Sequence, residues 1–170
     1  MAMTSDDLLA RLRALGVAYK LYEHAPVLTV EAMMAACGDI VGAHTKNLFL
    51  RDGKKTYFLV TLRHDAQVDL KAFRAVLGAR GGLSFASAEA LGAQLGVASG
   101  AVSPLAALNA APGSVRIFVQ DSLLAEARIN VHPLVSTRTL NLAPDDLLAA
   151  LRAEGHAPEP FALPGASQAA

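Results

Sequence analysis

The sequence predicts an α/β fold of the α+β-like kind, in which a mixed, curved and barrel-like sheet of about seven strands is surrounded by helices. Three observations support this class. Helical and strand patterns alternate along the chain, as they do where helices are layered on a sheet. Residues 56–62 are nearly all apolar, which predicts a central strand covered on both faces. The Asp52-Gly53 pair before them is typical of a hairpin, so one strand pair is antiparallel and a doubly wound parallel sheet fits less well.

The first expected element is a helix over residues 4–15. Thr4 and Asp7 have the spacing of a capping box at its start, and leucines at helical spacing form one apolar face. Gly16 ends the helix, because glycine readily adopts the left-handed conformation that follows a helix. Residues 17–22 alternate in polarity and predict a short strand.

A second helix and a hairpin follow. Thr29 is a favourable helix cap and Gly38 a favourable stop, so the helix lies between them. Residues 46–50 and 56–62 have β-rich compositions and predict two strands. The turn between them contains the Asp-Gly pair, so the two strands are expected to be neighbours.

The middle of the chain predicts two more helices. Residues 69–77 place leucine, valine and phenylalanine side chains on one helical face. Ser87 caps another helix, and residues 83–86 before it predict a short strand. Residues 96–112 are rich in small residues, glycine and proline, and predict mainly loop.

Three strands and one helix are expected in the last third. The strands are residues 115–120, 128–131 and 137–142. Pro144 suits the first position of a helix, and Gly155 suits its end.

Length and composition favour one folded domain. The chain has 170 residues, 53% of them hydrophobic, which is enough to bury a core without disulfides or metals. We expect a single domain over residues 1–160, with the Pro- and Ala-rich residues 161–170 as a frayed tail. The single cysteine, Cys37, excludes an internal disulfide and a cysteine-rich zinc site. The start of the chain does not have the pattern of a signal peptide and no apolar stretch is long enough to span a membrane, so we expect a cytoplasmic protein with no membrane partner.

Charge is distributed unevenly, although the net charge is zero. Residues 46–80 contain eight Lys or Arg and three Asp, a local charge of +5 that the rest of the chain balances. One interpretation is a basic face for the phosphate backbone of a nucleic acid. The other is an ordinary solvated surface, and charge alone favours it.

Three short stretches are candidates for a functional site, and each also has a purely structural interpretation. Lys46 stands at the start of an apolar strand, where it can donate to a phosphate or carbonyl oxygen, or simply protect a strand edge. Gly100 and Pro104 fix a loop whose backbone groups can hold a water or an oxyanion, or form a plain turn. His132 can act as a base, as a pocket wall or as a structural hydrogen-bonding residue, and no Asp or Glu lies close in sequence to orient it.

Motifs of several other catalytic classes are missing. The sequence has no phosphate-loop motif, no GxGxxG after a strand, no GxSxG and no HExxH. The five histidines are scattered without an i, i+4 pair, so no metal site is expected.

Several short runs occur in a specific order along the chain. They are His-Ala-Pro-Val at 24–27, Thr-Val-Glu-Ala at 29–32, His-Thr-Lys-Asn-Leu-Phe-Leu at 44–50, Leu-Ser-Phe at 83–85, Gly-Ala-Val-Ser-Pro-Leu at 100–105 and Asn-Val-His-Pro-Leu at 130–134. Together they resemble the YbaK/ProX family of aminoacyl-tRNA editing domains over residues 5–160, and within it the stand-alone ProXp-ala type, the PrdX-like Ala-tRNA(Pro) deacylases. The asparagine-containing runs at 44–50 and 130–134 are fairly specific in combination.

The resemblance implies a curved mixed sheet and hydrolysis of the ester between an amino acid and the terminal ribose of a tRNA. Water is the attacking group, the vicinal ribose hydroxyl of the substrate assists, and no metal or organic cofactor is needed. The implied catalytic residues are Lys46, Gly100, Ser103, Pro104 and His132. The expected substrate-binding residues are Val27, Leu28, Thr29, Val30, Asn47 and Val102. Lys46 would anchor the terminal nucleotide or the ester carbonyl, and His132 would line the amino-acid pocket. Backbone groups near Gly100 and Ser103 would hold the water or the developing oxyanion.

The function expected from this resemblance is editing in trans of mischarged tRNA(Pro), with alanine as the amino acid removed. One alternative is a YbaK-type deacylase of Cys-tRNA(Pro) or another aminoacyl-tRNA. The other is a non-catalytic module that docks on a tRNA or a synthetase. The expected partners are mischarged tRNA(Pro) and prolyl-tRNA synthetase, and the expected assembly is a monomer or a weak dimer.

Overall fold

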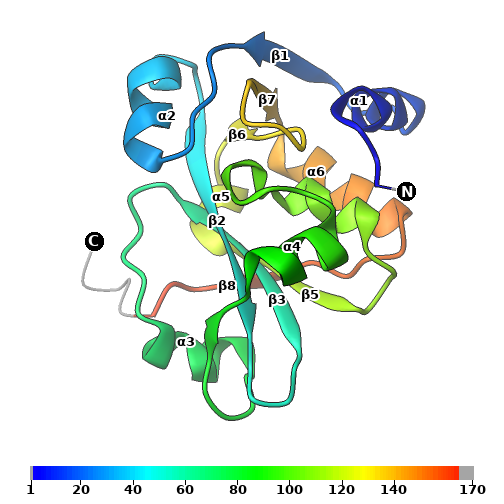
Figure 1. Ribbon diagram of the computed structural model, residues 1–170. Coiled ribbons are helices and arrows are strands. Elements are labelled where there is room, and N and C mark those ends of the chain that lie inside the picture. Colours follow the sequence, from blue (N-terminus) through cyan, green and yellow to red (C-terminus); the bar gives the residue numbers. More distant parts are fainter. Residues whose placement is uncertain (1, 165–170) are drawn as a thin grey trace.

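The computed structural model describes residues 2–164, in which six α-helices and two short 3-10 helices surround an eight-stranded sheet (Figure 1). The helices are α1 (Ser5–Ala14), α2 (Val30–Cys37), α3 (Leu70–Leu77), α4 (Ala88–Leu95), η1 (Ser99–Ala101), η2 (Pro104–Asn109), α5 (Asp121–Leu124) and α6 (Pro144–Ala153). The strands are β1 (Tyr19–Glu23), β2 (Ala43–Arg51), β3 (Tyr57–Arg63), β4 (Ser84–Phe85), β5 (Val115–Gln120), β6 (Ile129–Val131), β7 (Arg138–Leu142) and β8 (Glu159–Phe161).

The sheet is mixed, as the sequence predicts. Its strands are hydrogen-bonded in the order β1-β7-β6-β2-β3-β5-β8, and β4 also pairs with β2. β2 and β3 form the expected antiparallel hairpin, whereas β3 with β5 and β5 with β8 are parallel. The predicted α/β class with a mixed sheet is therefore confirmed.

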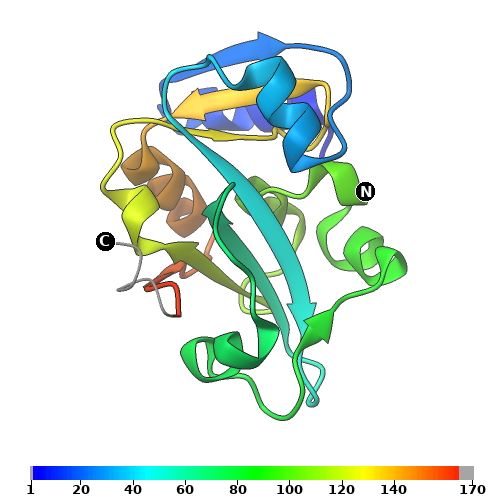
Figure 2. The ribbon, with the colours of Figure 1, turned by 90° about the vertical axis from the view of Figure 1, so that its left-hand side faces the viewer.

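Strand β2 changes its partner along its length, and this bends the sheet. Ala43 and His44 pair with β6 in parallel, whereas β2 from Thr45 onward pairs antiparallel with β3. Figure 2 shows the long β2 strand, in cyan, running from the layer of β1, β6 and β7 into the layer of β3 and β5. The residues at this change of partner lie at the junction of the two layers.

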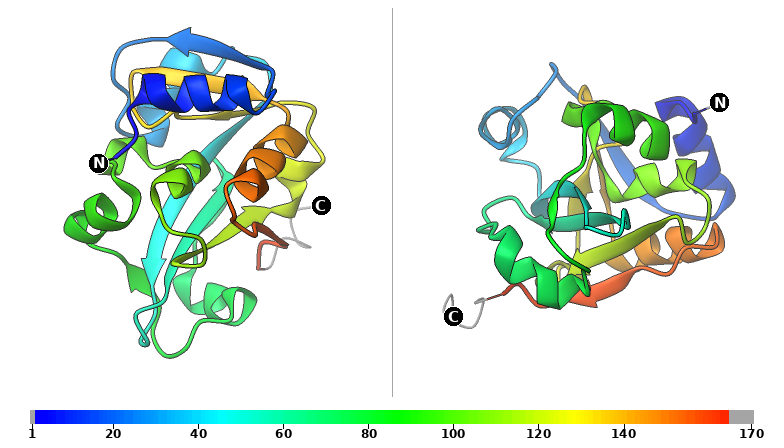
Figure 3. Two further views of the ribbon diagram at one scale, coloured as in Figure 1. Left: turned by 90° about the vertical axis from the view of Figure 1, so that its right-hand side faces the viewer. Right: turned by 60° about the horizontal axis from the view of Figure 1, so that its bottom comes forward.

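Strand β3 is covered on both faces, as its apolar run predicts. Leu59 faces a cluster that includes side chains of α1, α4, η2 and α6. Phe58 and Val60 face a second cluster, which includes Phe73 and Leu77 of α3. Figure 3 shows α3 on one side of the sheet, with α1 and α6 on the other. Alternate side chains of one strand thus contribute to two separate parts of the core.

The predicted helix starts are confirmed by hydrogen bonds. Thr4 Oγ1 accepts from the Asp7 backbone N–H at 3.0 Å, and the Asp7 carboxylate accepts from the Thr4 N–H at 3.1 Å, which completes the capping box. The side chains of Thr29, Asp69 and Ser87 cap α2, α3 and α4. These caps satisfy backbone N–H groups that have no partner within the helix.

The hairpin turn owes its shape to a carboxylate rather than to the glycine of the Asp-Gly pair. Asp52 is 4% exposed, and its carboxylate accepts from the backbone N–H groups of Lys54 and Thr56, at 2.9 Å each, and of Arg80 at 3.0 Å. Lys55, with φ of 65°, takes the left-handed conformation in this turn. The hairpin is therefore correctly predicted, but its turn is longer than the two-residue type.

Two segments in the middle of the chain differ from the sequence-based expectation. Residues 96–112 include η1 and η2, and Leu105, Ala106 and Ala107 of η2 are fully buried, so much of the expected loop belongs to the core. The four-residue helix α5 was not predicted, because it is too short to show helical periodicity.

Phe161, the first residue of the expected tail, belongs to a strand. Residues 159–161 form β8, parallel to β5, and Phe161 is only 6% exposed. Its ring lies 6.0 Å from that of Phe73 and 6.3 Å from that of Phe118, between centroids. The sequence did not predict this strand because it contains Pro160, and proline is tolerated in a sheet mainly on edge strands such as β8. The expected fraying of residues 165–170 lies outside the described residues.

The helices formed by residues 2–164 include none that is long and apolar enough to cross a membrane.

Candidate active site

A cavity of about 160 Å³ opens where β2 changes its partner. Four segments surround it: the start of α2, the first half of β2, the η1 turn and the end of β6. The lining residues are Val27, Leu28, Thr29, Val30, Met33, Thr45, Lys46, Asn47, Ser99, Gly100, Val102 and His132. Nine of the eleven residues expected in the site therefore meet around one cavity, although they are separated by up to about a hundred positions in sequence.

Lys46 brings a cation into this cavity. Its Nζ donates to the backbone carbonyl of Ala66, in the segment that follows β3. Burial lowers the pKa of Lys46, and the Asp65 carboxylate nearby opposes this effect. An ammonium group has three N–H donors, so two remain for a ligand oxygen. Lys46 is thus a half-buried donor whose side chain is fixed by a hydrogen bond, unlike an ordinary exposed surface lysine.

Asn47 connects the strand layer to the η1 turn. Its Oδ1 accepts from the Thr61 hydroxyl at 2.6 Å, and its Nδ2 donates to the Val102 carbonyl at 3.0 Å. Thr61 is fully buried on β3. The amide therefore fixes the position of the turn that forms one wall of the cavity, and one Nδ2 hydrogen remains for a ligand.

The turn from Ser99 to Val102 approaches the start of α2 closely. A Cβ atom on Gly100 would lie 2.6 Å from Cδ2 of Leu28, so this contact requires glycine unless the leucine side chain moves. Leu28 is 71% exposed, at the mouth of the cavity. The absence of a side chain at Gly100 thus lets backbone groups of the turn form the cavity wall.

Ser103 and Pro104 do not line the cavity. Ser103 is fully buried, and its Oγ accepts from the Leu105 backbone N–H at 3.1 Å as the cap of η2. Pro104 is the buried first residue of η2. Both residues therefore follow the turn that forms the cavity wall, and their side chains do not line the cavity.

His132 presents its Nε2 as a hydrogen-bond acceptor. Its Nδ1 lies 2.9 Å from the backbone carbonyl of Arg138, and because a carbonyl only accepts, Nδ1 carries the hydrogen. Burial lowers the pKa of His132, against the opposing effect of this bond, and the nearby His24 ring lowers it further. The two ring centroids lie 6.4 Å apart. The neutral form with the lone pair on Nε2 is therefore favoured.

Three lining residues, Met33, Thr45 and Ser99, were not among those expected. Met33 stands one helical turn after Val30, and this spacing was the available signal. The Thr45 hydroxyl donates to the backbone carbonyl of Asn130 at 2.7 Å, across the two layers. A further void of about 10 Å³ lies behind Met33, Thr45 and His132.

The cavity combines a cation, an amide donor, an imidazole acceptor and backbone groups with an apolar wall. Among the described residues, no hydroxyl that lines it is hydrogen-bonded to a histidine ring, so no nucleophile is paired with a base. No three His, Cys, Asp or Glu side chains within residues 2–164 lie close enough to hold a metal ion. This arrangement can bind a carbonyl or phosphate oxygen and orient a water molecule beside it.

The sequence and the fold both match known proteins. The profile of the family described as "Aminoacyl-tRNA editing domain" matches residues 24–150, which include every residue expected in the site. The "Prolyl-tRNA synthetase associated domain-containing protein 1" of Mus musculus is 40% identical over 157 residues, covering 89% of this chain and 92% of that protein. The "Prolyl-tRNA editing protein ProX" of Acetoanaerobium sticklandii is 36% identical over 149 residues, covering 87% of this chain and 90% of that protein.

Solved structures share the same fold. A crystal structure described as that of a candidate trans-editing enzyme for prolyl-tRNA synthetase superposes with a TM-score of 0.71 at 20% identity, covering 95% of this chain and 98% of that chain. A crystal structure of a hypothetical protein superposes with a TM-score of 0.72 at 19% identity, covering 91% of this chain and 97% of that chain.

Proposed function

The chain belongs to the aminoacyl-tRNA editing domain family and is an aminoacyl-tRNA deacylase, and we propose that it removes alanine from mischarged tRNA(Pro) in trans. Two curated relatives carry names that refer to prolyl-tRNA synthetase or to prolyl-tRNA editing, which supports tRNA(Pro) as the substrate. The observation that carries the proposal is the cavity in which Lys46, the η1 turn and His132 meet beside an apolar wall.

The proposed reaction is attack of water on the ester carbonyl. The new bond joins the water oxygen to the carbonyl carbon, and the bond to the ribose oxygen breaks. The water proton passes to that ribose oxygen, with help from the vicinal ribose hydroxyl. The products are the free amino acid and a tRNA whose terminal ribose carries both hydroxyls. An aminoacyl ester is already activated, so orientation of the ester and the water in the cavity supplies much of the required rate.

Several of the lining residues have a role in this proposed reaction. Lys46 donates to the ester carbonyl or to the terminal nucleotide, since only one of its three N–H groups has a partner within residues 2–164. Backbone groups of the turn at Gly100 hold the water or the developing oxyanion. His132 and the side chains of Val27 and Val30 enclose the amino-acid side chain.

Energetics explain the need for such an enzyme. A synthetase pocket built for proline rejects the smaller alanine weakly, because each missing methylene changes binding by only about 1–3 kcal/mol. A second site that admits alanine and excludes proline by size restores accuracy. The apolar side chains of Leu28 and Met33 narrow the cavity, in keeping with a small amino-acid side chain.

The direct test is a deacylation assay with tRNA(Pro) charged with alanine, cysteine or proline. We expect the alanyl species to be hydrolysed fastest and the prolyl species to be spared. A preference for the cysteinyl species would replace the alanine assignment with the YbaK-type alternative. Absence of hydrolysis of every species would exclude a deacylase and leave a non-catalytic module that docks on a tRNA or a synthetase.

Lys46→Ala tests the site itself, with Lys54→Ala as the matched control. Lys54 lies in the exposed hairpin turn, outside the cavity, so its loss removes the same charge elsewhere. We expect Lys46→Ala alone to lower turnover, by about tenfold or more for a lost transition-state donor. Equal activities of the two variants would refute the role of Lys46. A sedimentation or pull-down assay with prolyl-tRNA synthetase tests the expected partner separately.

A further inference from the structure

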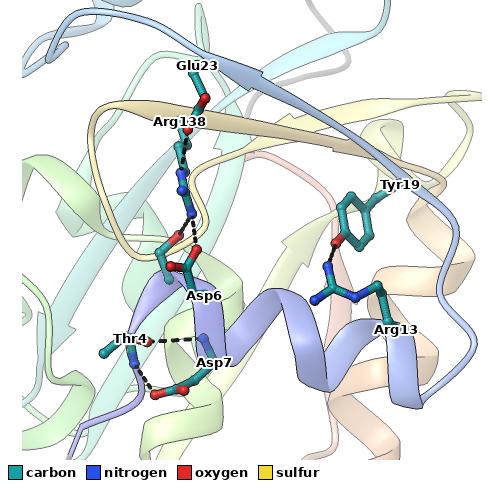
Figure 4. Close-up of polar contacts among 8 residues, drawn as sticks. Thr4, Asp6, Asp7, Arg13, Tyr19, Glu23 and Arg138 are labelled. Carbon is teal, nitrogen blue, oxygen red and sulfur yellow. Dashed lines mark hydrogen bonds and ion pairs between the residues drawn. The ribbon is translucent and has the colours of Figure 1, made fainter.

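Arg138, the first residue of β7, holds together the N-terminal helix and the first strand. Its Nη1 donates to the Asp6 carboxylate at 2.7 Å and lies 3.2 Å from the Ser5 hydroxyl, both on α1 (Figure 4). Its Nε donates to the Glu23 carboxylate, on β1, at 3.2 Å. The Arg138 side chain is 22% exposed. We call Arg138, Asp6, Ser5 and Glu23 the Arg138 clamp.

The same residue also determines the orientation of His132. The backbone carbonyl of Arg138 accepts the hydrogen of His132 Nδ1 at 2.9 Å. The two residues are the ends of a tight connection between β6 and β7, in which buried Leu134 has a left-handed backbone with φ of 69°. Arg138 and His132 are thus joined both by this hydrogen bond and by a short stretch of chain with one left-handed residue.

Neighbouring main-chain bonds place β1 against the same connection. The His24 N–H donates to the Thr137 carbonyl at 2.9 Å, and the Val27 N–H donates to the Ser136 carbonyl at 3.2 Å. Glu23 lies directly opposite Arg138 in the register of β1 and β7. The segment that follows β1 therefore contacts the stretch between His132 and Arg138, and Val27 of that segment lines the cavity.

Other polar contacts hold α1 without reaching this segment. Arg13 donates to the Tyr19 hydroxyl at 2.6 Å at the far end of the helix (Figure 4). Arg11 pairs with Glu154, at the end of α6. Apolar side chains of α1 also share a core cluster with Leu134 of this segment. Among these polar contacts of α1, the Arg138 clamp is the one whose arginine is bonded to a residue of the candidate site.

From this juxtaposition we propose that the Arg138 clamp is a positioning device for His132, so that α1 and β1 form part of the working site although the family match begins at residue 24. The proposal rests on the proposed function for its kinetic consequence only. Arg138 acts through its carbonyl, which keeps the hydrogen on Nδ1 of His132 and leaves the lone pair on Nε2. The Arg138 clamp fixes the position of the Arg138 backbone carbonyl.

The test removes clamp charges while the fold stays intact. Asp6→Asn, Glu23→Gln and the double variant weaken the clamp, and Glu154→Gln is the control because it removes a different ion pair of the same helix. Carboxylates as exposed as those of Asp6 and Glu23 contribute little to global stability, so the variants are expected to melt near the parent temperature. Asp6→Glu keeps the charge and is expected to restore the parent behaviour.

The primary measurement is the ¹⁵N NMR signature of the His132 ring, which distinguishes the two tautomers without any substrate. We expect the parent and the Glu154→Gln control to show a single tautomer with hydrogen on Nδ1, and the double clamp variant to show exchange between tautomers. With charged tRNA, the double variant is expected to lose about tenfold or more in kcat with a smaller change in KM, as displaced groups do.

An unchanged His132 tautomer in the folded double variant would overturn the proposal. So would an equal effect of Glu154→Gln, because that result would assign the change to general loosening of α1. If the parent protein hydrolysed no aminoacyl-tRNA, the proposed function would fail, but the NMR comparison would still decide whether the clamp positions His132.

Discussion

Replacement of Asn47 by alanine tests how the η1 turn is held against the strand layer. The substitution removes the acceptor of the Thr61 hydroxyl and the donor to the Val102 carbonyl, bonds of 2.6 and 3.0 Å. Two such bonds contribute about 0.5–1.5 kcal/mol each, and a fully buried hydroxyl left without an acceptor costs about 1–3 kcal/mol more. We therefore expect Asn47→Ala to lower the free energy of unfolding by about 2–6 kcal/mol.

A double-mutant cycle with Thr61→Val separates the energetic contribution of the buried Thr61 hydroxyl from that of the bond to the η1 turn. In the valine background only the bond to the Val102 carbonyl is lost, so Asn47→Ala should cost only about 0.5–1.5 kcal/mol there. The coupling between the two positions is then about 1.5 kcal/mol or more.

Urea unfolding followed by far-UV circular dichroism measures these differences, since the chain has no tryptophan for fluorescence. The same variant should raise KM for aminoacyl-tRNA, because the turn that forms one cavity wall loses its tether. Additive effects in the cycle, or a loss below about 0.5 kcal/mol for Asn47→Ala, would refute the bridging role of the amide.

Three further outcomes are expected. Gly100→Ala should have a urea midpoint near that of the parent, because the added methyl group meets only the movable end of the exposed Leu28 side chain. The methyl group should lower kcat/KM, because it narrows the cavity. Unchanged kinetics would contradict the close approach of Gly100 to Leu28. Asp52→Asn should lose about 2–3 kcal/mol in urea unfolding, because a neutral amide replaces a buried carboxylate that accepts three backbone N–H groups, and an unchanged midpoint would be contrary to this account. Burial lowers the pKa of His44 in the folded state, and the neighbouring His64 lowers it further, so unfolding takes up a proton below about pH 6.5. The contribution of His44 to stability is therefore complete above that pH and declines as the pH falls. His44→Leu should flatten the change in urea midpoint between about pH 5 and 7.5.

Much of the local structure could be predicted because its causes lie within a few residues. The cap of α1 depends on Thr4 and Asp7, three positions apart, and the hairpin depends on two adjacent β-rich runs. The strand β8 could not be predicted in the same way. Phe161 is held by rings from α3 and β5, far away in sequence, and its own segment is too short and too rich in proline to indicate a strand.

The candidate site was located in sequence by a family resemblance and not by spacing. Lys46 and His132, taken alone, have ordinary structural interpretations, and their mutual position depends on the pairing of β2 with both β6 and β3. Ser103 illustrates the limit of this approach, because it lies within the matching run but is buried as the cap of η2.

By itself, the sequence determined the longer helices with their caps and the central apolar strand, since these follow from local hydrogen bonds and from the period of apolar side chains. Only the tertiary structure decided how they combine. The change of partner along β2 brings Lys46 to the η1 turn and to His132, Asn47 becomes a bridge between layers, and Arg138 connects α1 to the His132 ring. Such contacts join residues many positions apart, and their geometry depends on how whole elements pack, which no short stretch of sequence encodes.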